Sequence, residues 1–279
     1  MLSPLLLQTS EFTQYITGAL STNVNLETLF GASAYASGIN KRVIVDSGTA
    51  VGSVGSSSYA LEIPAGFGGR IYLINKGYII GRGGSGGNAI NGNGSDGDDA
   101  IFAGAPNIFI DNRGLIAGGG GGGGRGGTGG NGTYDSTYAA SICTCPVCCG
   151  YSCTDTAPCT GGYTNEPNNG CAEGGWRWFC PQTSNSSGTI GGNGGSGAGY
   201  PYGATTGDSA SNATNNAGTG GDGGDGGGWG LDGDDGDPGA NGNDTNGLSG
   251  FSGGSAGRYI VNNSNVTWIT TGNVSGGVG

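Results

Sequence analysis

The chain has 279 residues, of which 69 are glycine and only 34% are hydrophobic, so no large apolar core is available. Its formal net charge is −11 with only 9 basic residues, which argues against a nucleic-acid-binding protein. Histidine is absent, so neither a Ser-His-Asp nor a Cys-His catalytic arrangement can be built. Aspartates are numerous, but the sequence does not single out a glycosidase-type pair. We expect no enzyme.

The first 40 residues mix leucine, phenylalanine and threonine without any repeat. Residues 2–7 are apolar, but they are few and carry no preceding basic residues, so we do not interpret them as a signal peptide. No stretch of the sequence is long enough to cross a membrane, and we expect no membrane insertion. Residues 1–40 are therefore treated as a separate N-terminal segment.

Three segments repeat one pattern, at residues 42–52, 70–81 and 107–118. Each has an apolar run rich in isoleucine and valine, then Asp or Asn, and then the turn glycine Gly48, Gly77 or Gly114. Such runs are typical of short strands, and the corners suit glycine at positive φ. Residues 41–117 are therefore predicted to form a platform of stacked strand–turn–strand units, either a small β-helix or a β-sandwich.

Glycine-rich sequence occupies residues 118–142 and 188–257, and 218–244 is a run of consecutive Gly-x-x triplets. A glycine at every third position is typical of a polyproline-II-type helix, which has no internal hydrogen bonds and needs outside partners. Packed polyglycine-II helices, a collagen-like trimer and a disordered linker are the alternatives. Pro238 is the only proline in the triplets, which weakens collagen, and the strict phase argues against disorder. We predict a scaffold of packed glycine helices.

All the cysteines lie in an insertion at residues 143–187. Disulfides are the expected use of an even number of cysteines in a short extracellular segment without a core. An all-cysteine zinc site and redox chemistry at a Cys-x-x-Cys motif are the alternatives. The disulfide or metal candidates are Cys143, Cys145, Cys148, Cys149, Cys153, Cys159, Cys171 and Cys180.

Acidic residues gather at Asp96, Asp98 and Asp99 and again between 222 and 244. They are interpreted as solvated charge that keeps a glycine lattice soluble. Calcium binding is the alternative, although neither cluster matches an EF-hand or a calcium-binding nonapeptide. We predict no cofactor. The chain ends with two apolar runs, 259–261 and 266–269, separated by Asn-Asn-Ser-Asn, so residues 258–279 are predicted to form a closing β-hairpin.

Three stretches carry a resemblance to a known family: INKGYIIGRGGSGG, IDNRGLIAGGGGGGG and AGRYIVNNSNVTWITTG. Together with the glycine blocks, residues 40–140 and 188–279 resemble the glycine-rich tail fibre and tail-tip proteins of tailed bacteriophages. The triplets are similar, more distantly, to the glycine-helix tip adhesins of T-even-type long tail fibres. The cysteine-rich insertion departs from both groups. The resemblance implies a mostly β virion protein with very little α-helix, made in the host cytoplasm and extracellular after lysis.

The resemblance further implies a structural tail component that takes part in adhesion to the host surface. Its partners would be other tail proteins, docked through residues 1–40, and a host polysaccharide or outer-membrane protein. We also expect a homotrimer. The alternatives are a purely structural tail or baseplate component and a cysteine-based metal-binding module. Aromatic rings that interrupt the glycine tracts could instead cap the scaffold, but are the receptor-contact candidates: Tyr200, Tyr202, Trp229, Phe251, Trp176 and Trp178.

Overall fold

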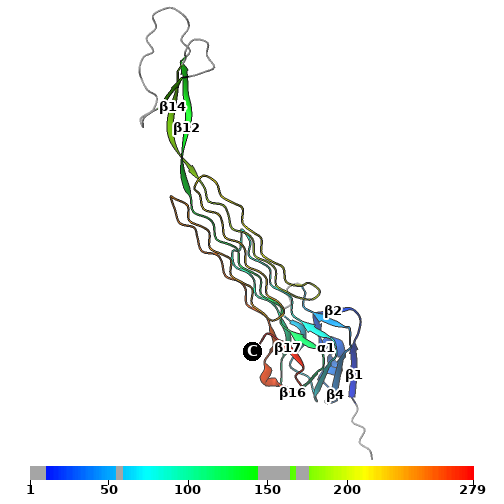
Figure 1. Cartoon of the computed structure of the whole chain (residues 1–279). Helices are drawn as coiled ribbons and strands as arrows, with labels where there is room; N and C mark the ends of the chain where they lie inside the picture. Colours follow the sequence, from blue (N-terminus) through cyan, green and yellow to red (C-terminus); the bar gives the residue numbers. More distant parts are fainter. Residues whose placement is uncertain (1–10, 55–58, 144–163, 168–175) are drawn as a thin grey trace, which may run out of the picture.

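A computed structural model describes residues 11–54, 59–143, 164–167 and 176–279. The molecule is elongated: a β-stranded platform lies at one end, a long array of extended segments leaves it, and a β-hairpin lies at the far end (Figure 1). The described part is mostly β, with two short α-helices, α1 (Leu26–Phe30) and α2 (Ala32–Ala36), and a 3-10 turn. The prediction of a mostly β chain with very little helix is confirmed.

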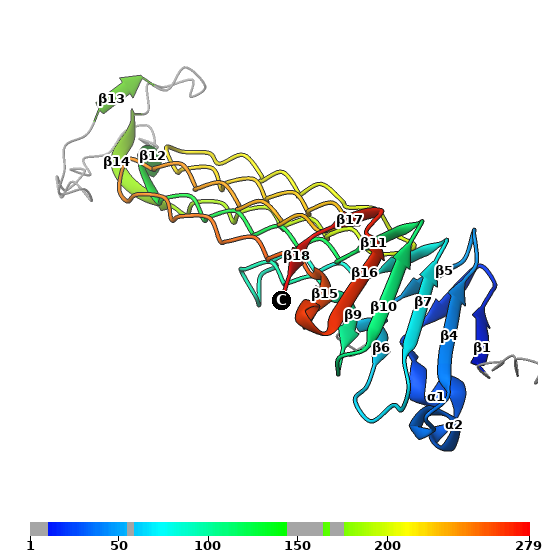
Figure 2. The same ribbon diagram turned by 90° about the horizontal axis from the view of Figure 1, so that it is seen from below.

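The platform is a three-sided parallel β-helix, the first of the two predicted alternatives (Figure 2). All strand pairs in its three sheets are parallel, as stacked coils require. One sheet contains β1 (Glu11–Ile16), β4 (Asn40–Val45), β7 (Ile71–Asn75), β10 (Ile108–Asn112) and β16 (Val266–Thr270). The second contains β2 (Leu20–Thr22), β5 (Ala50–Gly52), β8 (Tyr78–Ile80), β11 (Leu115–Ala117) and β17 (Asn273–Ser275). The third contains β3 (Val24–Asn25), β6 (Tyr59–Ile63), β9 (Asp99–Ala103), β15 (Arg258–Val261) and β18 (Gly277–Val278).

Two sequence-based predictions about the ends of the platform are wrong. Residues 11–40 are not separate from the repeat, because β1, β2 and β3 pair in register with β4, β5 and β6 and form the first coil. The closing segment is not a hairpin either. β15 and β16 lie in different sheets and pair in parallel with β9 and β10. The Asn-Asn-Ser-Asn stretch turns a corner of the coil, where Asn262 has φ 60° and a 3-10 turn spans Asn263–Asn265.

Inward side chains of successive coils stack into one apolar core. Val43 pairs with Leu73, and Leu73 pairs with Ile110, and all three are fully buried. Lys41 is also buried: its Nζ donates to the carbonyls of Ser37 and Gly68 at 2.5 and 2.6 Å, and burial lowers its pKa. Near the first coil, α1 begins at Asn25, whose Oδ1 accepts from the N–H of Thr28 at 3.2 Å.

The three turn glycines are required for different reasons. Gly48 has φ 80°, the left-handed conformation that the corner was predicted to need. Gly77 and Gly114 do not have positive φ, so that prediction is wrong for them. They are needed because the coils stack closely: an added Cβ would collide with the carbonyl of Asp46 at Gly77, at 2.6 Å, and with backbone of Gly77 at Gly114. The preceding Asn75 and Asn112 are buried and bonded to each other at 2.8 Å.

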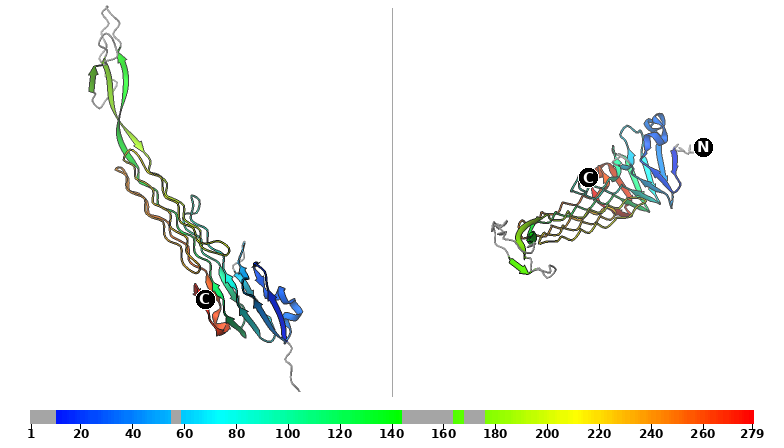
Figure 3. Two further views of the ribbon diagram at one scale, coloured as in Figure 1. Left: turned by 45° about the vertical axis from the view of Figure 1, so that its right-hand side comes forward. Right: turned by 90° about the horizontal axis from the view of Figure 1, so that it is seen from above.

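The glycine array is inserted at one corner of the β-helix, between the second and third sheets. Residues 81–98 interrupt the coil between β8 and β9, and residues 118–257 interrupt the next coil between β11 and β15. The chain runs out from the platform and back several times, and these segments lie side by side (Figure 3). Residues 118–131, 188–198 and 218–228 contain no α-helix or strand.

Segment 118–131 is the centre of the array. Its N–H groups donate, in rotation, to segments 92–98, 189–198 and 231–240; for example Gly122, Gly123 and Gly124 donate to Ser95, Gly195 and Asp234 at 2.8–2.9 Å. Its carbonyls accept from segments 81–87, 218–230 and 248–257 with the same three-residue period. The surrounding segments are bonded to one another as well, so the central segment is enclosed by a ring of neighbours.

The interior of the array is therefore made of backbone. Nearly all of residues 118–130 are buried, and only Arg125 and Thr128 are partly exposed. An added Cβ at Gly123 would lie 2.5 Å from the carbonyl carbon of Gly224, and one at Gly121 2.5 Å from that of Gly254. Glycine at these positions is a packing requirement, because any side chain would push two hydrogen-bonded segments apart.

Candidate functional site

The end of the molecule farthest from the platform is built from three strands. β12 (Gly132–Cys143) pairs antiparallel with β14 (Trp176–Ser186), which also pairs with β13 (Thr164–Pro167). The base of this hairpin is braced by two loops of the array. The Thr133 carbonyl accepts from the side chains of Asn216 and Asn243 at 3.0 and 2.9 Å, and its N–H donates to Asn243 Oδ1 at 2.7 Å. The hairpin and these loops together form the distal end.

Asn216 and Asn243 were missed by the sequence analysis, although a signal was present. Asn215 and Asn216 both have positive φ, at 57° and 62°, which asparagine tolerates better than most residues. The chain reverses direction there, between residues 205–210 and the glycine segment 218–228. An Asn-Asn pair immediately before a glycine tract therefore marked a turn at the end of the array.

The aromatic candidates do not share one surface. Trp176 and Trp178 belong to β14, opposite Cys143 and Ser141 in the hairpin, and are the candidates at the distal end. Tyr202 is 78% exposed and Trp229 38% exposed, and both lie in turns at the platform end, since Gly199 and Gly230 contact Gly83 and Ser275. Phe251 lies along the array, with its ring against Gly92.

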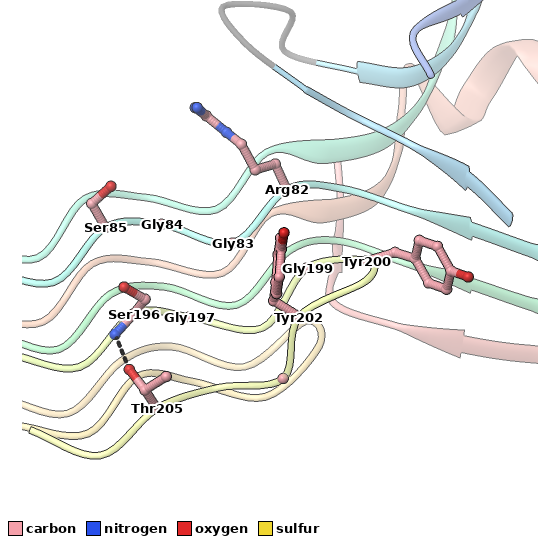
Figure 4. A pocket seen from close by; sticks show the side chains of 11 residues that line it. Arg82, Gly83, Gly84, Ser85, Ser196, Gly197, Gly199, Tyr200, Tyr202 and Thr205 are labelled. Carbon is pink, nitrogen blue, oxygen red and sulfur yellow. Dashed lines mark hydrogen bonds between the residues drawn. The ribbon is translucent and has the colours of Figure 1, made fainter. Parts of the chain in front are cut away.

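Tyr200 and Tyr202 border a groove of about 320 Å³ where the array meets the platform (Figure 4). The loop is closed by a bond from the Gly199 N–H to the Tyr202 carbonyl at 2.9 Å, and the Tyr200–Pro201 peptide is cis. The Tyr200 ring extends toward the platform strands (Figure 4). Arg82, on the opposite wall, is held by Asp98 at 3.2 Å. The two tyrosines thus occupy a shallow junction far from the distal hairpin.

The aspartates have a structural role in the array. At its perimeter, N–H groups that lack a neighbouring backbone segment donate to carboxylates instead: Gly253 to Asp235, Ser255 to Asp96 and Ala256 to Asp232, at 2.8, 2.8 and 2.6 Å. Asp225 and Asp222 accept in the same way from residues 207 and 210. At the junction with the platform, burial raises the pKa of Asp99, while the Arg258 N–H that it accepts works in the opposite direction.

Most of the cysteine candidates lie outside the described residues; only Cys143 and Cys180 fall within described strands. In the ladder, Cys143 is opposite Trp176 and Cys180 is opposite Tyr138. Disulfide pairing of the cysteines stays a prediction.

Within the described ranges, no group of three or more Cys, Asp or Glu side chains is arranged to hold a metal ion. Among the same residues, no helix is long and apolar enough to span a membrane.

The comparison with protein families decides what kind of molecule this is. The sequence profile of the phage tail fibre adhesin Gp38 family matches residues 11–178, more than half of the chain. The chain belongs to this family of phage tail fibre adhesins. The resemblance found in the sequence is thereby confirmed: the adhesin is a component of the phage tail fibre, located in the virion tail, that takes part in adhesion to the host.

No curated protein matches the adhesin significantly. Among solved structures, it is similar to the crystal structure of the gp37–gp38 adhesin tip complex of the long tail fibre of bacteriophage S16. The sequence identity is 21% and the TM-score 0.47, over 96% of this chain and 82% of the other.

Proposed function

We propose that the adhesin acts as a rod-like spacer, with its platform attached to the tail fibre and its distal end presented to the host receptor. The observation that supports this orientation is the separation of the two ends by the hydrogen-bonded glycine array (Figure 1). An array bonded in all lateral directions resists bending, so contacts at one end are held at a fixed distance from the other. Adhesion is proposed as its whole role, without catalysis.

We propose that the segments of the array are polyglycine-II helices. Their support is the three-residue period with which N–H groups at successive positions turn toward different neighbours. A polyproline-II-type backbone has three residues per turn and no internal hydrogen bonds, which fits both features.

The attachment surface is proposed to be the open face of the first coil, within residues 11–40 and their neighbours. The outer edges of β1, β2 and β3 have no partner strand among the described residues. Apolar side chains gather at this end: Phe12, Leu20 and Val54 are 37%, 44% and 41% exposed. An unpaired strand edge with apolar side chains is suited to pairing with another polypeptide. The proposed partner is another tail protein.

The homotrimer stays a prediction, but one of its reasons is lost. A three-residue period was expected to let identical chains pack around an axis. In the described part, the glycine segments pack on segments of their own chain, so the period requires no other copy.

Receptor contact is proposed at the distal end. Among the aromatic candidates, Trp176 and Trp178 are proposed to make it. Tryptophan is enriched in binding hot spots. The cysteines of the insertion are proposed to form disulfides, which would hold a segment too poor in apolar residues to fold on a core of its own. The proposed receptor is a surface polysaccharide or an outer-membrane protein of the host.

A pair of double variants tests the orientation: Trp176→Ala with Trp178→Ala, and Tyr200→Ala with Tyr202→Ala as the matched control at the platform end. The measurement is the affinity of the labelled full-length adhesin for host cells. Loss of a hot spot of 2 kcal/mol lowers affinity about 30-fold. We expect that loss for the tryptophan pair and an unchanged affinity for the tyrosine pair.

The reverse result would place the receptor at the platform junction and overturn the orientation. Unchanged affinity in both variants, with thermal unfolding as in the wild type, would favour receptor contact through the Asn-rich loops or a purely structural role. Phage particles that contain a normal amount of the adhesin but do not adsorb to host cells would show a defect in adhesion and not in assembly.

A further inference from the structure

Asparagine and aspartate precede glycine at many places in the glycine array, and such pairs are chemically labile. The backbone nitrogen of the glycine attacks the side-chain carbonyl carbon of the preceding residue and closes a succinimide ring. Glycine favours the reaction because it has no side chain to obstruct its nitrogen and its backbone adopts many conformations. The reaction requires a free glycine N–H and a backbone that can rotate, so a hydrogen bond from that N–H suppresses it.

The lattice occupies the glycine N–H at the Asp–Gly pairs of the array. Each of these N–H groups donates to a backbone carbonyl of a neighbouring segment at 2.9–3.0 Å; the glycines are Gly97, Gly223, Gly226, Gly233 and Gly236. Succinimide formation at these pairs therefore requires a lattice hydrogen bond to open first.

Most Asn–Gly pairs of the array are held in the same way. Gly94 donates to the carbonyl of Ser252 and Gly194 to that of Gly87, both at 2.9 Å. In the turn 241–247, the two glycine N–H groups donate to the Thr245 carbonyl and to Asn241 Oδ1, at 2.9 and 3.0 Å. The glycine at position 132 is buried where β12 begins.

Asn91–Gly92 departs from this pattern. The Gly92 N–H has no acceptor in the described part of the chain, although the Gly92 carbonyl accepts from the Arg125 N–H at 2.9 Å. Asn91 ends an exposed turn, residues 88–91, in which Ile90 is 91% exposed. The turn is held by Asn88, whose N–H donates to the Asn91 carbonyl at 2.7 Å and whose Oδ1 accepts from the N–H of Asn91 at 3.0 Å. Such exposed bonds open at a small free-energy cost.

The side chain of Asn91 is free as well. Within the described ranges it has no hydrogen-bond partner. In contrast, Oδ1 of Asn93 accepts from the Ser252 N–H at 3.3 Å, and Nδ2 of Asn193 donates to Asp208 at 3.1 Å. Both reacting groups of the 91–92 pair, the amide carbonyl carbon and the glycine nitrogen, are thus outside the lattice.

We propose that Asn91 is a modification site: it is the first Asn–Gly asparagine of the array to deamidate in the folded adhesin. The Gly92 nitrogen loses its proton to hydroxide and attacks Cγ of Asn91, so a C–N bond forms and ammonia leaves with a proton from water. A water molecule then opens the ring at either carbonyl. The product is aspartate or isoaspartate, and no oxidant or reductant takes part.

The modification changes a contact of the central segment. Both products carry a negative charge in place of a neutral amide, and isoaspartate lengthens the backbone by a methylene group. The Gly92 carbonyl, which accepts from Arg125, and the Phe251 ring against Gly92 then shift relative to segment 118–131. We expect a local loosening of segment 92–98. The β-helix strands of the platform contain no Asn–Gly pair and should not change.

The test follows the full-length adhesin at mildly alkaline pH. Samples are digested at intervals, and mass spectrometry measures conversion of the amide to the acid at each asparagine. We expect Asn91 to react about 10-fold faster than Asn93 and Asn193, which corresponds to the opening of one lattice hydrogen bond. In adhesin unfolded by urea, the three asparagines should react at similar rates, because each precedes a glycine that is no longer bonded.

A variant and its control complete the test. Asn91→Gln should abolish the early modification, because glutamine must close a larger ring and reacts far more slowly. Asn93→Gln should leave the rate at Asn91 unchanged. Equal rates at Asn91, Asn93 and Asn193 in the folded protein would overturn the proposal. The same order of rates in urea would also overturn it, because the local sequence and not the lattice would then set the order. These rate comparisons use the wild-type chain, so they do not depend on the folding of a variant.

Discussion

In the platform, Val43, Leu73 and Ile110 stack on one another and fill the interior of the β-helix with side chains. In the array, the equivalent interior positions are glycines such as Gly120 and Gly123, and the space between segments is filled by peptide groups. The first core is stabilised mainly by removing apolar surface from water, at about 25 cal/mol per Å². The second has almost no apolar surface to bury and depends on hydrogen bonds and close backbone contact.

This difference determines how the stability of each region responds to a substitution. A side-chain core loses energy in proportion to the volume removed, and its neighbours can relax partly into the gap. A backbone core has no side chains to adjust, and each net hydrogen bond contributes only about 0.5–1.5 kcal/mol. Ordering glycine costs more conformational entropy than ordering any other residue. The array is therefore stable only if nearly every bond in the lattice is made, and one added methyl group affects several segments.

The largest effect is expected from Gly123→Ala. The new Cβ would lie 2.5 Å from the carbonyl carbon of Gly224 and separate two segments of the lattice, so we expect a loss of about 3 kcal/mol or more. Thermal unfolding followed by circular dichroism measures it. Gly203→Ala is the matched control, because nothing lies within 4 Å of the added Cβ. Equal stability of the two variants would mean that the array is not close-packed.

A truncation of the other core comes next. Leu61 is fully buried in the platform, so Leu61→Ala removes volume and should cost about 2–5 kcal/mol. Leu20, 44% exposed in the first coil, provides the control substitution Leu20→Ala, which should change stability little. Because the cavity is local, hydrogen exchange should increase mainly in the platform. An equal increase in amide hydrogen exchange at Gly123 and Gly126, in the array, would show that the two cores do not respond separately to the substitution.

The same contrast explains what the sequence could predict. Alternating apolar residues and the Asp/Asn–Gly corners identified the stacked strands of residues 42–117, because a side-chain core leaves a period in the sequence. The three-residue glycine period identified segments that bond sideways. The first coil was missed because Phe12, Gln14 and Ile16 do not repeat the later pattern, although they pair with Lys41, Val43 and Val45.

Contacts between segments far apart in the chain were the part that sequence could not supply. A glycine triplet does not indicate which other segment it will pack against. The order of the segments around residues 118–131 is therefore set by loop lengths and by the platform. Nor does an aromatic residue in a loop show at which end of the array the loop lies. For this reason Tyr200, Tyr202 and Trp229 were grouped with Trp176 and Trp178, although they lie at opposite ends of the molecule.

A smaller effect is expected at the perimeter of the array. Asp235→Ala removes the acceptor for the Gly253 N–H, and we expect a loss of about 1 kcal/mol. Asp235→Asn is the matched control, because its amide oxygen can accept the same bond. Thermal unfolding of the two variants distinguishes an acceptor role from a charge role. If asparagine were as destabilising as alanine, the carboxylate charge would matter more than the bond.

The smallest effect is a pH dependence in the platform. Hydrogen bonds from Arg113 hold the pKa of Asp111 below its ordinary value, so its ionised form is stabilised by folding. That contribution is present above the unfolded pKa of about 3.9 and is lost as the pH falls through the lower folded value. Asp111→Asn should therefore lower the melting temperature at neutral pH, and the difference from the wild type should shrink below about pH 4.

Asp99 gives the opposite comparison. Burial raises the pKa of Asp99, so the stability that its protonated form contributes is lost as the pH rises. Melting temperatures of Asp111→Asn and Asp99→Asn across this range should diverge from the wild type in opposite directions. Parallel curves for all three proteins would show that neither carboxylate is coupled to folding.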